Sequence, residues 1–361
     1  MNVTAVDQFI PSLAVHDAIG AHTLQLQSLA MEMGFASHLY VQNVAPQLAS
    51  RARHYTAYRG GRGHVLLYQA SIGSPVADFL VGRPEPLLLS YHNITPAHML
   101  EHWEPAVSAE LDDARSELAR LARRTTHAIA DSGFNEAELR GLGYTSTSVS
   151  PPMIDPAAIS MAPDAATVDW LDHWRRTRGS VLLFVGRIIP NKAQHDLVRA
   201  FALYRALYDP GARLCLVGGV SSPRYLAALR AQVQDLGLTD VVDFTGGVSG
   251  PELAAYYRGA DVFVCLSDHE GFCVPVVEAM HHRLPVVGFD AGAVGETMGG
   301  AGLTLRSKSP ALVATAVNRV LTDSRLRESL IAAGSRRAMS LSLDAGRSSY
   351  RSELEKALSL L

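Results

Sequence analysis

A surplus of basic residues and a long apolar run are both missing from the 361-residue sequence. The formal net charge is −3, so we expect no basic surface that could hold a phosphate backbone, and therefore no nucleic-acid partner. No apolar run approaches the roughly 20 residues that a membrane-crossing helix needs. Arg51 is the first basic residue, so no charged segment typical of a signal peptide precedes it. We therefore expect a cytoplasmic protein whose membrane contact, at the inner face, is at most peripheral.

Cysteine is also scarce. The sequence has three cysteines, at positions 215, 265 and 273. An odd number argues against a disulfide framework, and the spacings match none of the usual metal-binding patterns. Both features suit a reducing compartment.

The remaining composition is typical of a globular α/β protein, with 48% hydrophobic and 19% charged residues. Short apolar runs alternate with longer helical patterns twice along the chain, which predicts two mostly parallel sheets with helices on both faces. The expected strands are residues 3–10, 38–41, 64–68, 87–91 and 127–130 in the first half, and 180–186, 213–219, 241–246, 261–267 and 284–290 in the second.

The domain boundary is predicted from a polar stretch, STSVSPPMIDP, at residues 146–156. We therefore predict one doubly wound, Rossmann-like domain over residues 1–155 and a second over residues 156–341. The last twenty residues, 342–361, have the pattern of an amphipathic helix.

The stretch DHEGFCVPVVEAM, residues 268–280, follows an expected buried strand. Pro275 suits the first turn of a helix, and a helix amino terminus at the carboxyl edge of a parallel sheet favours an anion such as phosphate. Glu270 and Glu278 could accept hydrogen bonds from sugar hydroxyls, but carboxylates repel phosphate. A ligand with both groups, a nucleotide sugar, fits. The alternative is that Glu278 only caps the helix and Glu270 is solvated.

Two cations follow another expected strand, in FVGRIIPNKAQHDLVRAF. Arg187 and Lys192 both lie before a helix, where a guanidinium and an ammonium group together suit the oxygens of a diphosphate. Lysine occurs only three times in the chain, at 192, 308 and 356, against 29 arginines, so its presence in this loop is notable. The alternative is an ordinary solvated loop.

These motifs carry a family resemblance. VGRIIPNKAQHDL, followed by DHEGFCVPVVEAMHHRLPVVGFDAGAVGETMGGAGL with two glutamates separated by seven residues, resembles the carboxyl-terminal half of a retaining, family 4 glycosyltransferase. SYHNITP and DSGFNEAEL resemble amino-domain segments of the same family, so the resemblance covers the whole chain. It implies the GT-B fold, two Rossmann-like domains facing a central cleft, with a closing helix from about Asp344 that returns to the first domain.

The resemblance implies roles for the charged residues of the second domain. Arg187 and Lys192 match the pair that neutralises the diphosphate leaving group. Glu270 matches the acid that contacts the donor sugar, and Glu278 the acid that holds the ribose hydroxyls. The sequence contains no Asp-x-Asp, a common metal-binding motif for sugar nucleotides, so we expect no metal requirement and no other cofactor.

Further positions are implied as donor contacts. Backbone groups of Gly271, Phe272, Cys273 and Val274 would face the sugar and phosphate, Val248 would lie near the base, and Gly218 would lie at the end of the neighbouring strand. Cys273 replaces a glycine that is common in the family.

In the first domain, His92 matches the histidine near the transferred sugar, and Gly20 matches the loop after the first strand, where the family often has two glycines. A strand-end histidine is otherwise more often only hydrogen-bonded structure. The implied reaction is a same-face displacement in which His92 orients the sugar and the departing phosphate helps to deprotonate the acceptor.

The expected activity is transfer of a hexose from a UDP- or GDP-linked sugar to a hydroxyl of a glycan, lipid-linked glycan or small natural product. A sugar-nucleotide epimerase, a phosphorylase and a noncatalytic glycan-binding relative remain alternatives with the same fold. An NAD-linked oxidoreductase is disfavoured, because neither VGGVSS nor VGRIIP supplies the Gly-x-Gly-x-x-Gly turn.

Overall fold

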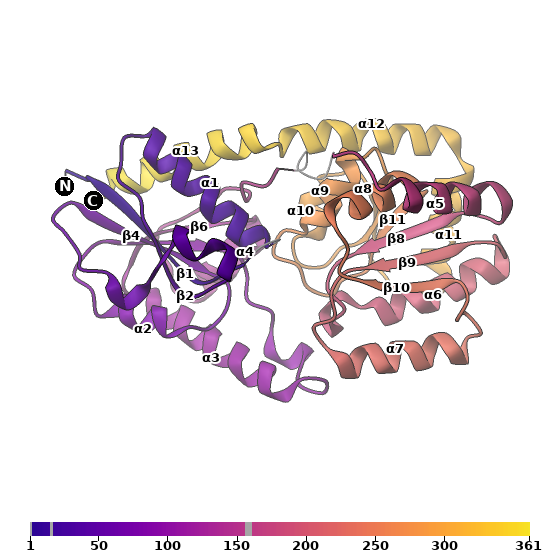
Figure 1. Ribbon diagram of the computed structural model, residues 1–361, viewed down its shortest axis with the longest axis horizontal. Helices are drawn as coiled ribbons and strands as arrows, with labels where there is room; N and C mark the ends of the chain where they lie inside the picture. Colours follow the sequence, from indigo (N-terminus) through magenta and orange to yellow (C-terminus); the bar gives the residue numbers. More distant parts are fainter. Residues whose placement is uncertain (1, 15–16, 156–160) are drawn as a thin grey trace. The chain divides into compact units, whose positions relative to one another are not determined.

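The computed structural model describes residues 2–14, 17–155 and 161–361. The chain divides into two compact units (Figure 1). The amino-terminal unit contains Met1–Glu101, Pro105–Ile154 and Ser342–Leu361, and the carboxyl-terminal unit contains His102–Glu104 and Asp155–Leu341. Pro156, where we predict that the second domain begins, lies outside the described residues.

The amino-terminal unit is built on a seven-stranded sheet with the order β3-β2-β1-β4-β5-β6-β7, in which all neighbours pair in parallel. Its strands are β1 (Ala5–Leu13), β2 (Leu39–Val44), β3 (Arg53–His54), β4 (His64–Ala70), β5 (Leu87–Tyr91), β6 (Thr125–Ala130) and β7 (Thr147–Val149). Its helices are α1 (Ala18–Glu32), α2 (Pro75–Val81), α3 (Pro105–Leu121), α4 (Gly133–Gly141) and α13 (Leu343–Ser359), and short 3-10 turns cover Pro46–Arg51, Tyr55–Ala57 and Ala97–Met99.

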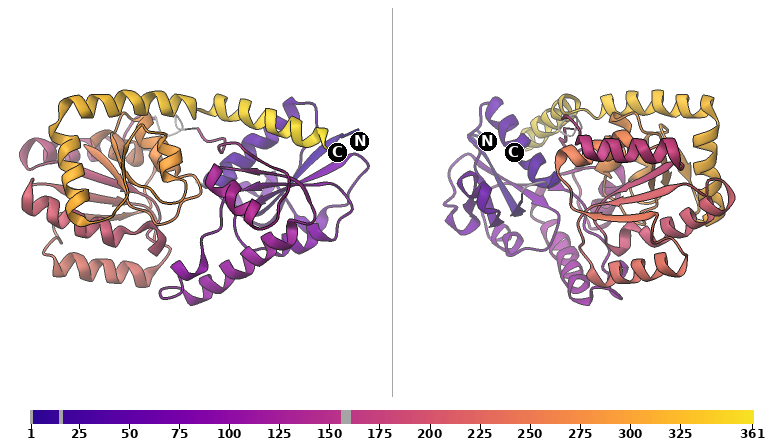
Figure 2. Two further views of the ribbon diagram at one scale, coloured as in Figure 1. Left: turned by 180° about the vertical axis from the view of Figure 1, so that it is seen from behind. Right: turned by 45° about the vertical axis from the view of Figure 1, so that its right-hand side comes forward.

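Successive side chains along each strand point to opposite faces of this sheet, and both faces are apolar. In β5, Leu87 and Leu89 pack on the face that α2, α3 and α4 cover, whereas Leu88 packs on the opposite face with α1 and α13. Helices α1 and α13 lie on this second face in each view (Figure 2). Tyr350 and Leu354 of α13 are fully buried there, so the last helix of the chain completes the core of the amino-terminal unit.

The carboxyl-terminal unit has a six-stranded parallel sheet with the order β10-β9-β8-β11-β12-β13. Its strands are β8 (Val181–Val185), β9 (Arg213–Val217), β10 (Val242–Gly246), β11 (Val262–Cys265), β12 (Val286–Phe289) and β13 (Leu303–Leu305). Its helices are α5 (Ala165–Thr177), α6 (Gln194–Leu207), α7 (Pro223–Asp235), α8 (Gly250–Gly259), α9 (Val274–His281), α10 (Val294–Met298), α11 (Pro310–Thr322) and α12 (Ser324–Ser340), with the 3-10 turn η5 at Pro190–Lys192.

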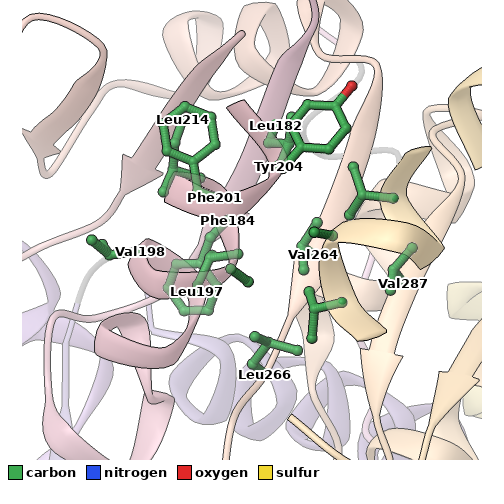
Figure 3. Packing of buried hydrophobic residues seen from close by; sticks show 14 of the residues in the cluster. Leu182, Phe184, Leu197, Val198, Phe201, Tyr204, Leu214, Val264, Leu266 and Val287 are labelled. Carbon is green, nitrogen blue, oxygen red and sulfur yellow. The ribbon is translucent and has the colours of Figure 1, made fainter. Parts of the chain in front are cut away.

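One face of this sheet packs against α6, α7 and α11. Leu182 and Phe184 of β8 meet Phe201 and Tyr204 of α6 in a large apolar cluster that continues through Val264 of β11 (Figure 3). Helices α5, α8 and α9 contact the strands from the other side. The sheet is therefore buried on both faces, as the near-continuous apolar runs in the sequence predict.

The two doubly wound parallel sheets confirm the predicted fold class. All ten expected strands are present, and β3, β7 and β13 were missed because each is only two or three residues long. Among the helices of the described residues, none combines the length and the apolar character needed to cross a bilayer.

Candidate functional site

Four neighbouring strands of the carboxyl-terminal unit end at one edge of the sheet, in the order β10, β9, β8, β11. Each is followed by predicted site residues: Val248 after β10, Gly218 after β9, Arg187 after β8, and Glu270 after β11. Val248 is half-buried in the loop before α8. The fold thus places residues from distant parts of the sequence along one carboxyl edge, where open parallel sheets bind ligands.

The backbones are closely packed at this edge. Gly218 has φ +147°, and a Cβ there would lie 2.1 Å from the carbonyl oxygen of Gly186. Its N–H donates to the carbonyl of Gly246 at 3.0 Å. Gly218 is therefore required for the approach of β9 to the loop after β8, whatever it contributes to a ligand.

Lys192 and Glu270 form a buried ion pair. The Lys192 Nζ lies 2.6 Å from Glu270 Oε2, and the two side chains are only 17% and 10% exposed. Burial acts to lower the pKa of Lys192, but the Glu270 carboxylate outweighs it, and the net effect raises the pKa. The ammonium group is therefore held charged at the edge of the sheet before any ligand is bound.

Arg187 is placed differently. It is exposed, and within the described part of the chain its guanidinium forms no hydrogen bond or ion pair. Its backbone carbonyl accepts a 2.8 Å hydrogen bond from Gln194 Nε2, which ties the loop after β8 to the first turn of α6. The structure therefore supplies one fixed cation, Lys192, and one that is free to move toward an anion.

The loop from Asp268 to Cys273 is held by hydrogen bonds. The Asp268 N–H donates to Asn191 O at 2.8 Å, and Ala293 N–H donates to Glu270 O at 2.8 Å. Lys308 Nζ lies 2.6 Å from Asp268 Oδ1 and 2.6 Å from Asp196 Oδ2. Lys308 was not predicted as a site residue, although the scarcity of lysine could have drawn attention to it. The ion pair between Lys308 and Asp268 holds the start of the loop.

Gly271, Phe272, Cys273 and Val274 form the turn into α9. Cys273 is the residue before the helix and has φ 75° and ψ 65°, in the left-handed region. No side chain among the described residues caps the amino terminus of α9, and Pro275 occupies its first turn, as predicted. Thr297 Oγ1 donates a hydrogen bond to the Phe272 carbonyl from α10. The helix dipole is thus available to an anion.

Glu278 lies one turn into α9 and has a buried partner. The Tyr257 hydroxyl of α8 donates a 2.7 Å hydrogen bond to Glu278 Oε2, and the Tyr257 ring stacks on His282 at 5.3 Å. Burial raises the pKa of Glu278, an effect that the Tyr257 hydrogen bond only partly offsets. Neither glutamate is therefore a freely solvated group. Tyr257 could not be found from the sequence around Glu278, because it is 21 positions away on another helix.

Two of the cysteines meet beneath this loop. The sulfurs of Cys265, at the end of β11, and Cys273 lie 3.8 Å apart. The hydrogen bond with Cys265 and burial together raise the pKa of the Cys273 thiol. The spacing of the cysteines in the sequence did not indicate that these two residues lie together.

In the amino-terminal unit, His92 follows β5 and is enclosed by polar groups. Its Nδ1 lies 2.9 Å from Asp131 Oδ2 and its Nε2 lies 2.7 Å from Gln69 Oε1. Gln69 Nε2 donates to Gln8 Oε1 at 2.9 Å, and Gln8 Nε2 donates to the Thr23 carbonyl at 3.2 Å.

This chain of hydrogen bonds sets which atom of Gln69 meets His92. The Thr23 carbonyl can only accept, so it sets the orientation of the Gln8 amide and then that of the Gln69 amide. The Gln69 amide oxygen therefore faces His92 Nε2, while His92 Nδ1 lies beside the Asp131 carboxylate. The side chain is 2% exposed, so direct contact with a sugar requires that one of these hydrogen bonds is broken.

Gly20 does not lie in a loop after the first strand, and this prediction is wrong. Asp17 caps α1 through a 2.9 Å hydrogen bond from the Gly20 N–H to Asp17 Oδ2, so Gly20 belongs to the first helical turn. Its N–H is already used, which argues against a phosphate contact. A Cβ at Gly20 would lie 3.1 Å from the Ala14 carbonyl oxygen, which explains the small residue by packing. Val15 and His16, also in this segment, lie outside the described residues.

Comparison with solved structures defines the class of fold. Sucrose-phosphate synthase from Thermosynechococcus elongatus is 18% identical with a TM-score of 0.76, covering 99% of this chain and 100% of that one. Anabaena HepE in complex with UDP and glucose is 18% identical with a TM-score of 0.74, covering 99% of this chain and 100% of that one. These likenesses show that the chain has the GT-B fold.

Sequence comparison gives matches to parts of the chain. Residues 173–337 match the family described as "Glycosyl transferases group 1", which confirms the predicted resemblance to glycosyltransferases for most of the carboxyl-terminal unit. A GDP-mannose-dependent alpha-(1-6)-phosphatidylinositol monomannoside mannosyltransferase from Mycobacterium tuberculosis is 32% identical over 232 residues, 61% of this chain and 59% of that protein. A D-inositol 3-phosphate glycosyltransferase from Stackebrandtia nassauensis is 35% identical over 199 residues, 51% of this chain and 43% of that protein. The chain thus spans about half the length of these relatives.

Proposed function

We propose that this protein is a retaining glycosyltransferase of family 4, which moves a hexose from a nucleoside-diphosphate sugar to an acceptor hydroxyl without a metal ion. The acceptor is a glycan, a lipid-linked glycan or a small natural product. A cytoplasmic location, with peripheral contact at the inner face of the membrane, is part of the proposal.

One observation carries this proposal: the carboxyl edge of β8 and β11 combines cations, carboxylates and a helix amino terminus. Lys192 and Arg187 offer positive charge, the amino terminus of α9 adds a dipole, and Glu270 and Glu278 accept hydrogen bonds from hydroxyls. This mixture suits a ligand that carries both phosphates and sugar hydroxyls. The match of the same unit to the group 1 glycosyltransferases supports this assignment.

In the proposed reaction, positive charge in the site lowers the barrier by stabilising the negative charge that develops on the leaving diphosphate. The Lys192 ammonium is already in place and mostly buried, so little reorganisation is needed at the moment of transfer. Glu270, held by Lys192, would align the hydroxyls of the donor sugar, and Glu278, held by Tyr257, would bind the ribose.

The base function is proposed to belong to the departing phosphate. Both ring nitrogens of His92 are already engaged, with Asp131 and Gln69, which supports a role in orientation rather than general base catalysis. Backbone groups of Gly271 to Val274, with Val248 and Gly218 at the neighbouring strand ends, complete the proposed donor contacts.

The donor base is proposed as uracil or guanine. Anabaena HepE is a solved complex with UDP, and the mycobacterial relative is named for its dependence on GDP-mannose. Stabilisation by UDP or by GDP distinguishes the two bases.

The first test is ligand stabilisation in EDTA with UDP, GDP, ADP, dTDP and NAD. A ligand present at 100 times its Kd adds about 2.7 kcal/mol to the folded state, which a thermal shift detects. We expect one nucleoside diphosphate to stabilise the wild type, and Glu278→Ala to lose the effect. Stabilisation by NAD alone would contradict the proposal.

Product analysis then separates the reactions that share this fold. With the matching sugar nucleotide and a mixture of glycan and lipid-linked acceptors, we expect an acceptor-dependent glycosidic bond with the anomeric configuration of the donor. Inverted configuration would refute the retaining mechanism. A product formed without an acceptor would indicate an epimerase, and phosphate-dependent cleavage would indicate a phosphorylase.

A further inference from the structure

Three side chains with metal-binding atoms converge beneath the loop that leads into α9. Cys265 ends β11, Cys273 precedes α9, and Glu270 lies between them in the sequence. Their two sulfurs and one of the carboxylate oxygens lie within 4.8 Å of one another. The three residues are 1%, 6% and 9% exposed, so the cluster is buried beneath the protein surface.

The separation of the two sulfurs matches a tetrahedral metal centre. With a Zn–S distance of about 2.3 Å and tetrahedral angles, two coordinating sulfurs are about 3.8 Å apart. Cys265 Sγ and Cys273 Sγ lie 3.8 Å apart. A zinc ion could therefore bind both sulfurs without a change in their separation.

The charges of the neighbourhood balance around such an ion. Two thiolates, one carboxylate and one divalent cation together carry a charge of −1, and the adjacent Lys192 ammonium brings the total to zero. Lys192 Nζ holds Oε2 of Glu270 at 2.6 Å, and the second oxygen of the carboxylate can bind a metal. A neutral cluster avoids the penalty of a buried net charge.

The backbone at Cys273 provides an independent observation. A φ of 75° is unfavourable for a residue with a Cβ, and glycine would adopt it without that penalty. The chain nevertheless has a cysteine here, with its sulfur directed at Cys265 and not at solvent. A function for the thiol would account for this conformation.

We propose that Cys265, Cys273 and Glu270 form a binding site for a thiophilic divalent cation, with zinc as the best match. Two thiolates and one carboxylate favour a borderline-soft metal over magnesium or calcium, which prefer oxygen ligands alone. Binding releases the two thiol protons to solvent and replaces the hydrogen bond between the sulfurs by two metal–sulfur bonds.

If the proposed function is correct, this site regulates it. A cation bound to Glu270 removes that carboxylate from the hydroxyls of the donor sugar, and transfer is inhibited. This consequence rests on the proposed function, whereas metal binding does not. Activity in EDTA and inhibition by added zinc are thus compatible.

The test is a cobalt titration of the full chain, kept reduced with a phosphine. We expect one Co²⁺ per chain, with near-ultraviolet sulfur-to-cobalt charge-transfer absorption and the intense visible bands of tetrahedral cobalt, and we expect Zn²⁺ to abolish these bands. Cys265→Ser and Cys273→Ser should lose the charge-transfer absorption. Cys215→Ser is the matched control, because Cys215 is equally buried but lies on β9, 3.8 Å from Asp243 Oδ2.

A second measurement does not depend on whether the variants fold. The zinc X-ray absorption spectrum of the wild type should show two sulfur ligands. The proposal is overturned if the wild type shows no sulfur-to-cobalt absorption, if the zinc spectrum shows only nitrogen and oxygen ligands, or if the Cys265→Ser and Cys273→Ser variants keep the wild-type bands.

Enzyme assays distinguish the two proposals. We expect zinc to inhibit transfer by the wild type and Cys215→Ser, and to have at least tenfold less effect on Cys265→Ser. Normal metal spectra without transferase activity would contradict the proposed function alone. Activity in EDTA without any metal spectrum would contradict the metal site alone.

Discussion

Removal of either partner of the Lys192–Glu270 ion pair should destabilise the carboxyl-terminal unit strongly. The two charges lie 2.6 Å apart and are 17% and 10% exposed, so each is the main compensation for the other. Lys192→Met keeps the length of the side chain but leaves Glu270 unpaired. Loss of one partner from a buried pair costs about 3–5 kcal/mol. For a domain of this size, that corresponds to a decrease in Tm of roughly 6–20 °C.

The double variant separates stability from catalysis. In Lys192→Met/Glu270→Gln no buried charge is left unpaired, so we expect most of the stability to return. The transfer rate should stay about a hundred- to thousandfold below the wild type, because the positive charge that the leaving diphosphate needs is still missing. Stability is measured by denaturant unfolding, and transfer is measured well below the lowest Tm.

Lys356→Met provides the control. Lys356 also lies 2.7 Å from a carboxylate, that of Glu353, but its side chain is 64% exposed, so its loss should change stability by less than about 1 kcal/mol. The reasoning is refuted if Lys192→Met is no more destabilising than this control, or if the effects of the two single substitutions simply add in the double variant. An unchanged transfer rate in Lys192→Met would remove Lys192 from the proposed mechanism.

Three further predictions concern other parts of the two units. Because the pKa of Glu278 is raised in the folded state, ionisation of this carboxyl group opposes folding as the pH rises. In unfolding experiments at pH 7, Glu278→Gln should therefore be more stable than the wild type. The difference should shrink as the pH falls toward 4.5, the ordinary pKa of glutamate. A difference that grows in acid would contradict this. Gly218→Ala should lower the free energy of unfolding, measured with denaturant, by about 2 kcal/mol or more, because its Cβ would lie 2.1 Å from the Gly186 carbonyl oxygen. Gly247→Ala is the control and should have little effect, because a Cβ there would have no atom within 4 Å. Equal losses in the two variants would refute the packing argument. His92→Ala should lower turnover but leave nucleoside-diphosphate binding, measured by calorimetry, unchanged; lost binding would exclude the proposed orienting role.

The strands were the most predictable part of the fold. A strand buried on both faces requires a near-continuous apolar run, so VLLFV and VFVC are recognisable from composition alone. The short edge strands β3 and β13 could not be recognised in this way, because two or three residues are too few to form a pattern. Gly20 was misplaced for a related reason: where α1 begins is decided by the Asp17 cap, a local hydrogen bond that can form at several positions in such a segment.

The charged residues of the candidate site were identifiable because a strand, a loop and a helix amino terminus leave a local pattern. Arg187 and Glu270 could be assigned to the carboxyl ends of two strands from the sequence around each. Their partners could not. Tyr257 beside Glu278, and Asp131 and Gln69 beside His92, are separated from those residues by 21 to 39 positions.

The residue pattern alone was enough to predict two parallel α/β sheets whose strands are followed by cations, carboxylates and a helix amino terminus. These features depend on side-chain periodicity and on neighbours within a few residues. Three pairings were visible only in three dimensions: Lys192 with Glu270, His92 with Gln69, and Cys265 with Cys273 at 3.8 Å. Such pairings depend on strand order and on the path of each loop, and the resulting burial determines how strongly the paired groups interact.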